Sequence, residues 1–170
     1  MGVLAVSSAA SAEPSATPSA FVEPHVAWIH PATGLSGVGE GFSTGARVGF
    51  YPSATVPVAI AAGFGVSCAQ HLDCWENGVI GLRYARASSS HVAILVDGFG
   101  GLETVGLHVG KELYGYVGIA SVTVVYRDGA LDVGPQLGIT YSNVPSYDAD
   151  IGPNPSGTMT SLGVVADYRW

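Results

Sequence analysis

LGVVADYRW, residues 162–170, ends the chain and holds its clearest periodicity. Every second residue of this segment is apolar or aromatic: Leu162, Val164, Ala166, Tyr168 and Trp170. The positions between them include Asp167 and Arg169. Successive side chains of a β-strand point to opposite faces of the sheet. The segment therefore predicts a strand with one apolar face and one polar face.

The same alternation returns along most of the chain. We expect eight strands, at residues 21–30, 45–50, 58–67, 80–85, 91–97, 114–127, 131–141 and 161–170. Asp128-Gly129 separates two of them, and an Asp-Gly pair is a strong signal for a tight hairpin. Pro24 has no backbone N–H to donate, so its strand suits an early or edge position.

The composition favours a membrane setting for these strands. Charged residues make up 11% of the 170 residues, against about 25% in soluble proteins, so apolar surface must face something other than water. Only helices and closed barrels satisfy every backbone hydrogen bond inside a bilayer. The longest apolar run, residues 56–66, contains Pro57 and Gly63 and is shorter than the roughly 20 residues of a membrane helix. The predicted fold is one all-β domain over residues 21–170, an eight-stranded antiparallel up-and-down transmembrane β-barrel.

The N-terminal residues differ in composition from this barrel. Residues 1–12 are small and apolar, and Ala10-Ser11-Ala12 fits the small-residue pattern at which export signals are cleaved. We predict a signal peptide, present in part, over residues 1–12 and a Pro/Ser/Ala-rich linker over residues 13–20. The alternative for residues 1–12 is a disordered Ala/Ser tail.

The net charge of −7, with only six Lys and Arg residues, argues against nucleic-acid binding, because phosphate recognition needs a basic patch. The sequence contains no nucleotide-binding fingerprint in a convincing context, and we expect no cofactor.

The predicted links between strands alternate in length. Short links are expected at residues 52–56, 87–90 and 128–129, and long links at residues 31–41, 68–78, 100–112 and 143–157. Outer-membrane barrels place short turns on the periplasmic side and long loops outside the cell. Residues 104–109 also alternate, which leaves open a further strand segment or a strand that rises well above the membrane.

The eight alternating segments and the terminal aromatic residues Tyr168 and Trp170 resemble the small outer-membrane barrels: the OmpA-type membrane domain, the opacity proteins and the OmpX-like proteins. The final aromatic residue resembles the assembly signal of that class. The resemblance implies a place in the outer membrane of a Gram-negative envelope, contact with outer-membrane lipid and insertion by the barrel assembly machinery. It also implies that an extracellular ligand would bind through the long loops.

The polar faces of the predicted strands carry charges of both signs. We expect an ion-pair network in the lumen, centred on Arg47 and Arg83; its other members are Glu23, Asp97, Asp132, Asp167 and Arg169. His25 and Gln136 share these faces. A narrow polar pore is one interpretation, but side chains just fill a lumen of this size, so a plugged structural core is favoured.

Cys68 and Cys74 bracket the short segment CAQHLDC. Because an exported protein folds in an oxidising compartment, we expect a disulfide between them. A metal site that uses these cysteines with His71 and Asp73 is the alternative.

The last long link carries Asp148, Asp150 and Asn154 at alternating positions. This spacing is similar to a loose calcium-binding loop, but the closing glutamate is missing and two prolines interrupt it. An acidic, solvated surface loop is the favoured interpretation, and no metal is expected.

Ser142-Asn143 is distantly similar in placement to the His-x-Ser-Asn segment of the lipid A 3-O-deacylase barrels. Thr140 stands where that family has its histidine, and no glutamate follows on the final strand. A serine without a base is a weak nucleophile. The resemblance therefore implies at most an inactive relative, with Ser142 as the one weak catalytic candidate.

Three functions remain open at this point. The favoured one is a non-enzymatic outer-membrane barrel with a structural or adhesin-like role. The second is a lipid A-modifying outer-membrane enzyme, or an inactive relative of one. The third is a soluble, secreted, lipocalin-like barrel, which would carry its apolar faces inside and its polar faces outside.

Replacing Trp170 by Asp should impair assembly into the membrane, because the change removes the terminal aromatic residue. Fractionation of cells that express wild type and variant, followed by immunoblotting, measures this. Normal membrane levels of the variant would contradict the proposed assembly signal.

Overall fold

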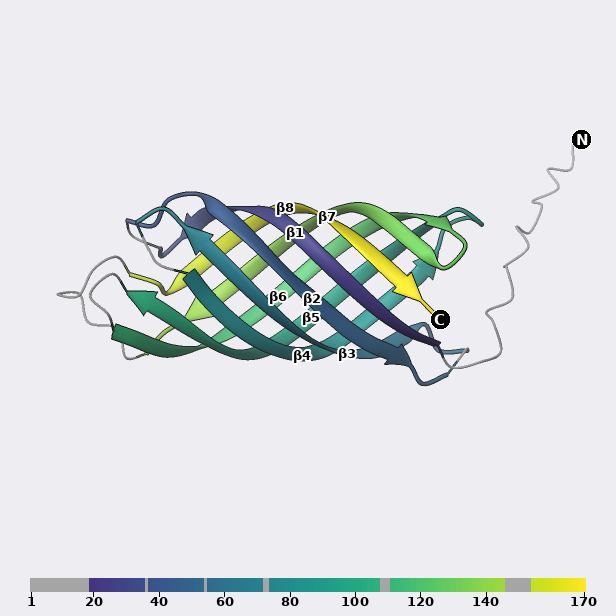
Figure 1. The fold of residues 1–170 in the computed structure, drawn as a ribbon, viewed down its shortest axis with the longest axis horizontal. Helices are drawn as coiled ribbons and strands as arrows, with labels where there is room; N and C mark the ends of the chain where they lie inside the picture. The colour runs from purple at the N-terminus through teal and green to yellow at the C-terminus, as the bar shows by residue number, and fades with distance from the viewer. Residues whose placement is uncertain (1–18, 36, 54, 72–73, 108–110, 146–153) are drawn as a thin grey trace, which may run out of the picture.

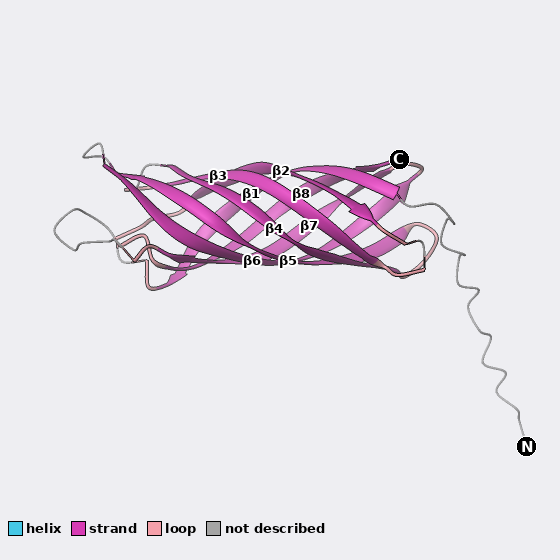
Figure 2. Cartoon of the chain, turned by 90° about the horizontal axis from the view of Figure 1, so that it is seen from below, coloured by secondary structure: helices cyan, strands magenta, loops and turns pink. Residues whose placement is uncertain are grey.

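The computed structural model describes residues 19–35, 37–53, 55–71, 74–107, 111–145 and 154–170. These residues form a closed antiparallel barrel in which sequence neighbours are hydrogen-bonded to one another (Figure 1). Its strands are β1 (Ser19–Thr33), β2 (Gly41–Tyr51), β3 (Val58–Ala69), β4 (Cys74–Ala87), β5 (Val92–Leu107), β6 (Lys111–Asp128), β7 (Leu131–Asn143) and β8 (Gly157–Arg169). The predicted all-β, eight-stranded up-and-down barrel is confirmed. Among the described residues, no helix is long and apolar enough to cross a membrane (Figure 2).

The last strand closes the barrel against the first. β8 runs antiparallel to β1, and Val22 lies opposite Tyr168. This pairing leaves neither strand with an edge of unpaired backbone groups. The ladder between β1 and β8 stops at Val22 and resumes at His25, because Pro24 between them has no N–H to donate.

The two ends of the barrel differ. β1, β3, β5 and β7 end at one end of the barrel, called here the loop end, and β1 begins and β8 ends at the other, called the terminal end (Figure 1). The predicted signal peptide and most of the predicted linker lie outside the described residues, and β1 begins at Ser19.

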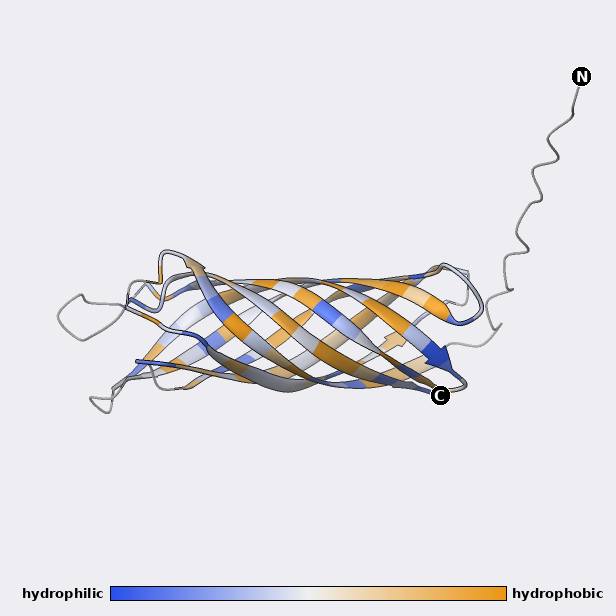
Figure 3. Cartoon of the chain, turned by 90° about the horizontal axis from the view of Figure 1, so that it is seen from above, coloured by the Kyte–Doolittle hydropathy of each residue, from blue (hydrophilic) through white to orange (hydrophobic). Residues whose placement is uncertain are grey.

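Alternation along each strand separates an outward apolar face from an inward face. On β8, Leu162 is 61% exposed and Asp167 is 1% exposed, and Trp170, directly after the strand, is 64% exposed. Figure 3 displays this change of hydropathy from residue to residue along the strands. The segment that ends the chain thus has the two faces that its sequence predicts.

Two of the predicted long links are largely strand. The link predicted at residues 100–112 is wrong, because β5 and β6 remain paired up to Leu107 and Lys111. The link predicted at residues 68–78 is also wrong, because β4 begins at Cys74. In β5 the cause is glycine: Gly98 and Gly100 occupy outward positions and interrupt the apolar alternation. The alternating residues 104–107 belong to β5, which extends to that point.

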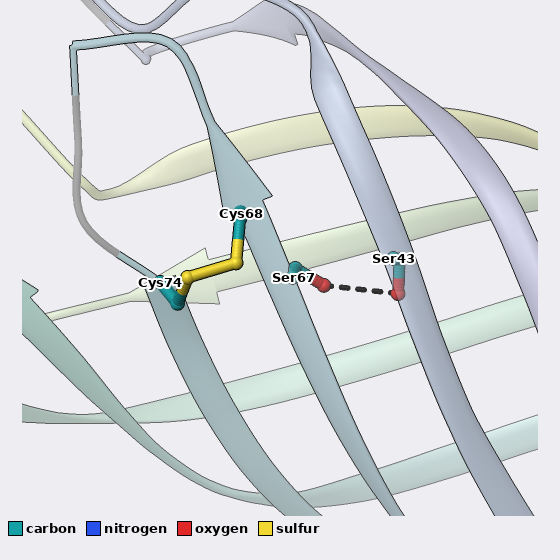
Figure 4. Close-up of a disulfide and its surroundings, with 4 residues drawn as sticks. All are labelled: Ser43, Ser67, Cys68 and Cys74. Carbon is teal, nitrogen blue, oxygen red and sulfur yellow. Dashed lines mark hydrogen bonds between the residues drawn. A yellow bond between two sulfur atoms is a disulfide. The ribbon is translucent and has the colours of Figure 1, made fainter.

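A disulfide joins β3 to β4 near the loop end. Cys68 and Cys74 lie directly opposite each other, with their Cα atoms 4.1 Å apart (Figure 4). Ser67, directly before Cys68 on β3, faces inward, and its hydroxyl donates a hydrogen bond to Ser43 Oγ at 3.0 Å (Figure 4). Both sulfur atoms are used by the disulfide, so neither is a thiolate ligand for the alternative metal site.

Glycines on the inward face make room for large side chains on neighbouring strands. A Cβ atom on Gly49 would lie 2.6 Å from the Phe21 ring, and one on Gly63 would lie 2.9 Å from Arg47 Cγ. Ala59 and Ala61 are the neighbouring inward residues of β3, and both are buried. β3 therefore forms a thin wall against which side chains from other strands can pack.

Replacing Gly49 by Ala should destabilise the barrel, because the added methyl group overlaps the Phe21 ring and the Ile60 carbonyl oxygen. Overpacking of this kind costs about 1–3 kcal/mol. Gly98→Ala is the matched control, since a Cβ atom there meets no atom within 4 Å. Equilibrium unfolding by urea in detergent micelles measures both variants, and equal losses of stability would contradict this account of the packing.

Candidate functional site

A cluster of five charged side chains fills the middle of the barrel interior. Its centre is Arg83 on β4, which is fully buried. Arg83 Nε donates to Asp97 Oδ1 at 2.7 Å, and Arg83 Nη2 donates to Glu23 Oε2. Arg47 Nη1 donates to the same two carboxylates, at 3.0 Å to Glu23 Oε1 and 3.1 Å to Asp97 Oδ2. The two arginines and the two carboxylates therefore share one another as partners. We call these four residues, together with Asp167, the central cluster.

The central cluster connects strands on opposite sides of the barrel. Arg83 Nη1 donates to Asp167 Oδ2 on β8 at 2.8 Å. Ser121 on β6 donates to Asp97 Oδ2 at 3.2 Å, and Gln136 Nε2 on β7 donates to Ser121 Oγ at 3.3 Å. Seven strands thus contribute a polar side chain, and β3 contributes the small residues that leave space for them.

Two phenylalanine rings cover the guanidinium groups of the central cluster. The Arg83 guanidinium carbon lies 4.5 Å from the centre of the Phe21 ring, and that of Arg47 lies 4.8 Å from the centre of the Phe99 ring. A cation over an aromatic face is attracted by the ring quadrupole, and more strongly when both are shielded from water. The rings therefore stabilise the positive charges and exclude solvent from them.

A second ion-pair group lies nearer the terminal end. Arg169 Nη2 donates to Asp132 Oδ1 at 2.8 Å, and Arg127 Nε lies 3.5 Å from Asp132 Oδ2. Asp132 lies directly opposite Asp167 on the neighbouring strand. Like charges in that position destabilise a sheet. The arginines of the two groups offset this repulsion from both sides.

The two groups together contain equal numbers of basic and acidic side chains. They hold four arginines, Arg47, Arg83, Arg127 and Arg169, and four carboxylates, Glu23, Asp97, Asp132 and Asp167. These are four of the six basic residues of the whole chain. A buried charge is tolerated only when it is paired. The arrangement is thus a core of matched charges.

A small polar cavity separates the central cluster from the loop end. It has a volume of about 40 Å³ and is lined by His25, Ser43, Ser67, Thr140 and Arg47. His25 Nδ1 is buried there without a protein hydrogen-bond partner. A space of this size with several polar groups around it accommodates ordered water.

Apolar side chains fill the interior at the loop end. The cluster consists of Ile29, Leu35, Val38, Trp75, Val105, Leu113, Val144 and Met159. Leu35 and Val38 come from the β1–β2 link, and Val144 comes from the β7–β8 link, so residues of two links fold into the barrel. We call this set the outer plug.

Ser142, the weak catalytic candidate, lies inside the barrel. Its side chain is fully buried, and its hydroxyl is hydrogen-bonded to Glu103 Oε1 and lies 2.9 Å from the Pro155 carbonyl oxygen. Thr140 also faces the interior, where it lines the polar cavity. A hydroxyl in this position cannot reach a lipid on the outer surface of the barrel.

The weak metal candidates receive no support from the part of the chain that is described. Asn154 Oδ1 accepts a hydrogen bond from Ser156 N at 2.9 Å, and Asp148 and Asp150 lie outside the described residues. Among the described residues, no group of three or more His, Cys, Asp or Glu side chains is placed to hold a metal ion.

The inward residues that the sequence did not predict include Phe21, Phe99 and Glu103. All three are buried, at 0%, 6% and 4% exposure. Phe99 and Glu103 are two and six residues after Asp97 on β5, so the alternation of side chains places all three on the inward face. This alternation could have predicted them. Glu103 is absent from the predicted inward face because it lies within the predicted link at residues 100–112.

Replacing Arg83 by Met should destabilise the barrel, because three buried carboxylates would lose a cationic partner. Breaking a buried ion pair from one side costs about 3–5 kcal/mol. Arg86→Met on the same strand is the control, since Arg86 is exposed. Urea unfolding in micelles compares the two, and similar stabilities would mean that the central cluster contributes little.

Comparisons with known proteins agree with the fold. No protein-family model matches the sequence, and no curated protein matches it. Among solved structures, Neisserial surface protein A (NspA) superposes with a TM-score of 0.58 at 15% identity, covering 89% of this chain and 95% of that one. A major outer membrane protein from Thermus thermophilus superposes with a TM-score of 0.52 at 14% identity, covering 89% of this chain and 99% of that one. The chain therefore shares its fold with a bacterial surface protein and a bacterial outer-membrane protein.

Proposed function

We propose that this chain is a β-barrel protein of a bacterial outer membrane, with a filled lumen and a structural or surface-binding role. The observation that carries the proposal is the outward face of the strands. Its middle is apolar, with Ile80, Leu82, Leu137 and Val164 between 51% and 65% exposed. Apolar side chains on the outer surface of a barrel are stable when lipid hydrocarbon surrounds them.

Aromatic residues bound this apolar band at both ends. Towards the loop end the exposed aromatic residues are Trp28, Phe42, Tyr114, Tyr116 and Tyr141. Towards the terminal end they are Phe50, Tyr84, Tyr126, Tyr168 and Trp170. Aromatic girdles at the two membrane interfaces are typical of outer-membrane barrels. The distribution supports a bilayer around the middle of the strands.

The polarity of the interior argues against a soluble lipocalin-like barrel. Such a barrel holds an apolar ligand in an apolar cavity. Here the middle of the lumen contains the central cluster, and two small spaces beside it, each of about 40 Å³, have polar as well as apolar lining residues. An apolar ligand would have neither room nor matching side chains there.

Because the lumen is filled, we expect any partner to bind at the surface of the barrel. The central cluster occupies the middle and the outer plug occupies the loop end, so the interior favours stability over transport. At the loop end, Gly39 N donates to Gln70 O at 2.9 Å and Gln70 N donates to Glu40 O at 3.0 Å. These bonds fix the β1–β2 link against the β3–β4 turn, which gives an extracellular partner a defined surface to contact.

The location is tested by inserting a charge into the band. Leu137→Arg places a cation near the middle of β7, where the side chain is 64% exposed, and should cost about 2–4 kcal/mol if lipid surrounds it. Ser88→Arg, in the exposed β4–β5 turn, is the control. Membrane fractionation and the heat-dependent gel shift of folded barrels report the folded, inserted fraction.

The expected result is recovery of wild type and Ser88→Arg in the outer membrane, with reduced folded Leu137→Arg. Recovery of wild type as a soluble protein without detergent would overturn the proposal. Planar bilayer recordings address the lumen separately, and a steady ion conductance of wild type would contradict a filled interior.

A further inference from the structure

Glu103 on β5 is a buried carboxyl group outside the two ion-pair groups. It is 4% exposed and lies across β6 from Ser142 on β7. β6 runs between them and presents Gly115, where a Cβ atom would lie 3.0 Å from Glu103 Oε1. The missing side chain lets Glu103 reach across β6 to the Ser142 hydroxyl.

Ser142 Oγ lies between two oxygen atoms. It is within hydrogen-bonding reach of Glu103 Oε1 and 2.9 Å from the Pro155 carbonyl oxygen. A carbonyl oxygen can only accept, and an ionised carboxylate can only accept, whereas a serine hydroxyl has a single proton to donate. Both contacts are therefore satisfied together only when Glu103 carries a proton, which it donates to Ser142 Oγ while Ser142 donates to Pro155.

Among the described residues, the groups that contact Glu103 are uncharged. Its cross-strand neighbours are Asn77 on β4 and Gly115 on β6, and Ser142 and Pro155 complete its contacts from β7 and the β7–β8 link. Among the described side chains, no Lys, Arg or His forms an ion pair with it. The titratable residues beside it on the adjoining strands, Glu76, Tyr114 and Tyr116, are exposed and point away from the lumen, as does Glu112 further along β6. An ionised carboxylate without a partner is costly at such a site.

We propose that Glu103 is protonated in the folded barrel and, through Ser142, latches the segment before β8 to the barrel wall, and that ionisation of Glu103 releases this latch. When the proton leaves, Ser142 can donate to only one of its two acceptors, and the buried carboxylate draws water towards itself. The contact with Pro155 is then lost.

Release of the latch loosens the outer plug. Val144, a member of the plug, is two residues from Ser142, and its N–H donates to Ser156 Oγ at 2.9 Å. Pro155 and Ser156 are held together with Val144 by this bond. The latch therefore stabilises the plug at low pH, and its contribution disappears as pH rises through the ionisation of Glu103. These contacts lie inside the barrel, so the inference does not depend on the proposed membrane location or role.

Infrared spectroscopy of the full chain, refolded in detergent micelles at pH 6, tests the proton directly. An exposed glutamate with an ordinary pKa of about 4.3 is ionised at that pH. Glu103→Gln removes one carboxyl group and keeps a neutral donor in its place. The expected difference spectrum, wild type minus Glu103→Gln, contains a carboxylic acid C=O band. A carboxylate band in its place would overturn the proposal.

Hydrogen exchange at the Val144 amide tests the latch. Its protection in wild type should fall about tenfold as pH rises, which is the effect of losing roughly one hydrogen bond. Glu103→Gln should keep its protection at every pH, because its amide donates to Ser142 regardless of pH. Ser142→Ala should be weakly protected throughout. Parallel loss of protection in wild type and Glu103→Gln would overturn the latch, and this comparison holds even if Ser142→Ala fails to fold.

Discussion

The pairing of β8 with β1 is the constraint on which the rest of this barrel depends. Closure supplies every strand with two neighbours, so the outer surface can be apolar from one aromatic girdle to the other without leaving backbone groups unpaired. It also confines the inward side chains to a narrow lumen. Polar groups enclosed there cannot rely on bulk water and must satisfy one another. The balanced charges, the inward glycines and the apolar outer plug all follow from this confinement.

The interior solves the problem of enclosed charge in two ways. In the central cluster each carboxylate meets a guanidinium group, and aromatic rings shield the cations. Near the loop end, where arginine is absent from the described contacts, Glu103 meets only neutral groups and bonds to a hydroxyl. Together with the second ion-pair group, the first solution gives a core with four arginines and four carboxyl groups. The second is compatible with burial only when the carboxyl group is neutral. One lumen thus holds carboxyl groups that pair with guanidinium groups and one carboxyl group that bonds to a hydroxyl.

Alternation alone predicted the architecture, because a strand between an apolar outer surface and a polar lumen must change character at every residue. Segments 131–141 and 162–170 carry this signal without interruption. The alternation is interrupted where glycine faces outward, as at Gly98 and Gly100. The part of β5 nearest the loop end, which includes Glu103, was therefore not predicted as strand. Alternation predicts that Arg83 and Asp97 both face inward, but it does not predict the contact between Arg83 and Asp167. These two residues lie on strands that do not pair, and their distance depends on the curvature and stagger of the closed sheet.

The position of Asp167 on the final strand has a consequence for the order of assembly. Arg83 is separated by 60 residues from Glu23 and by 84 residues from Asp167. Contacts so distant in sequence form late, after the intervening chain has been organised. Until β8 arrives, Arg83 faces the lumen short of one of its three acidic partners, and the sheet still has two open edges. Backbone pairing and charge neutralisation are therefore completed in the same step. An unfinished barrel has both unpaired strand edges and an incompletely paired Arg83, so the final steps of folding are strongly cooperative.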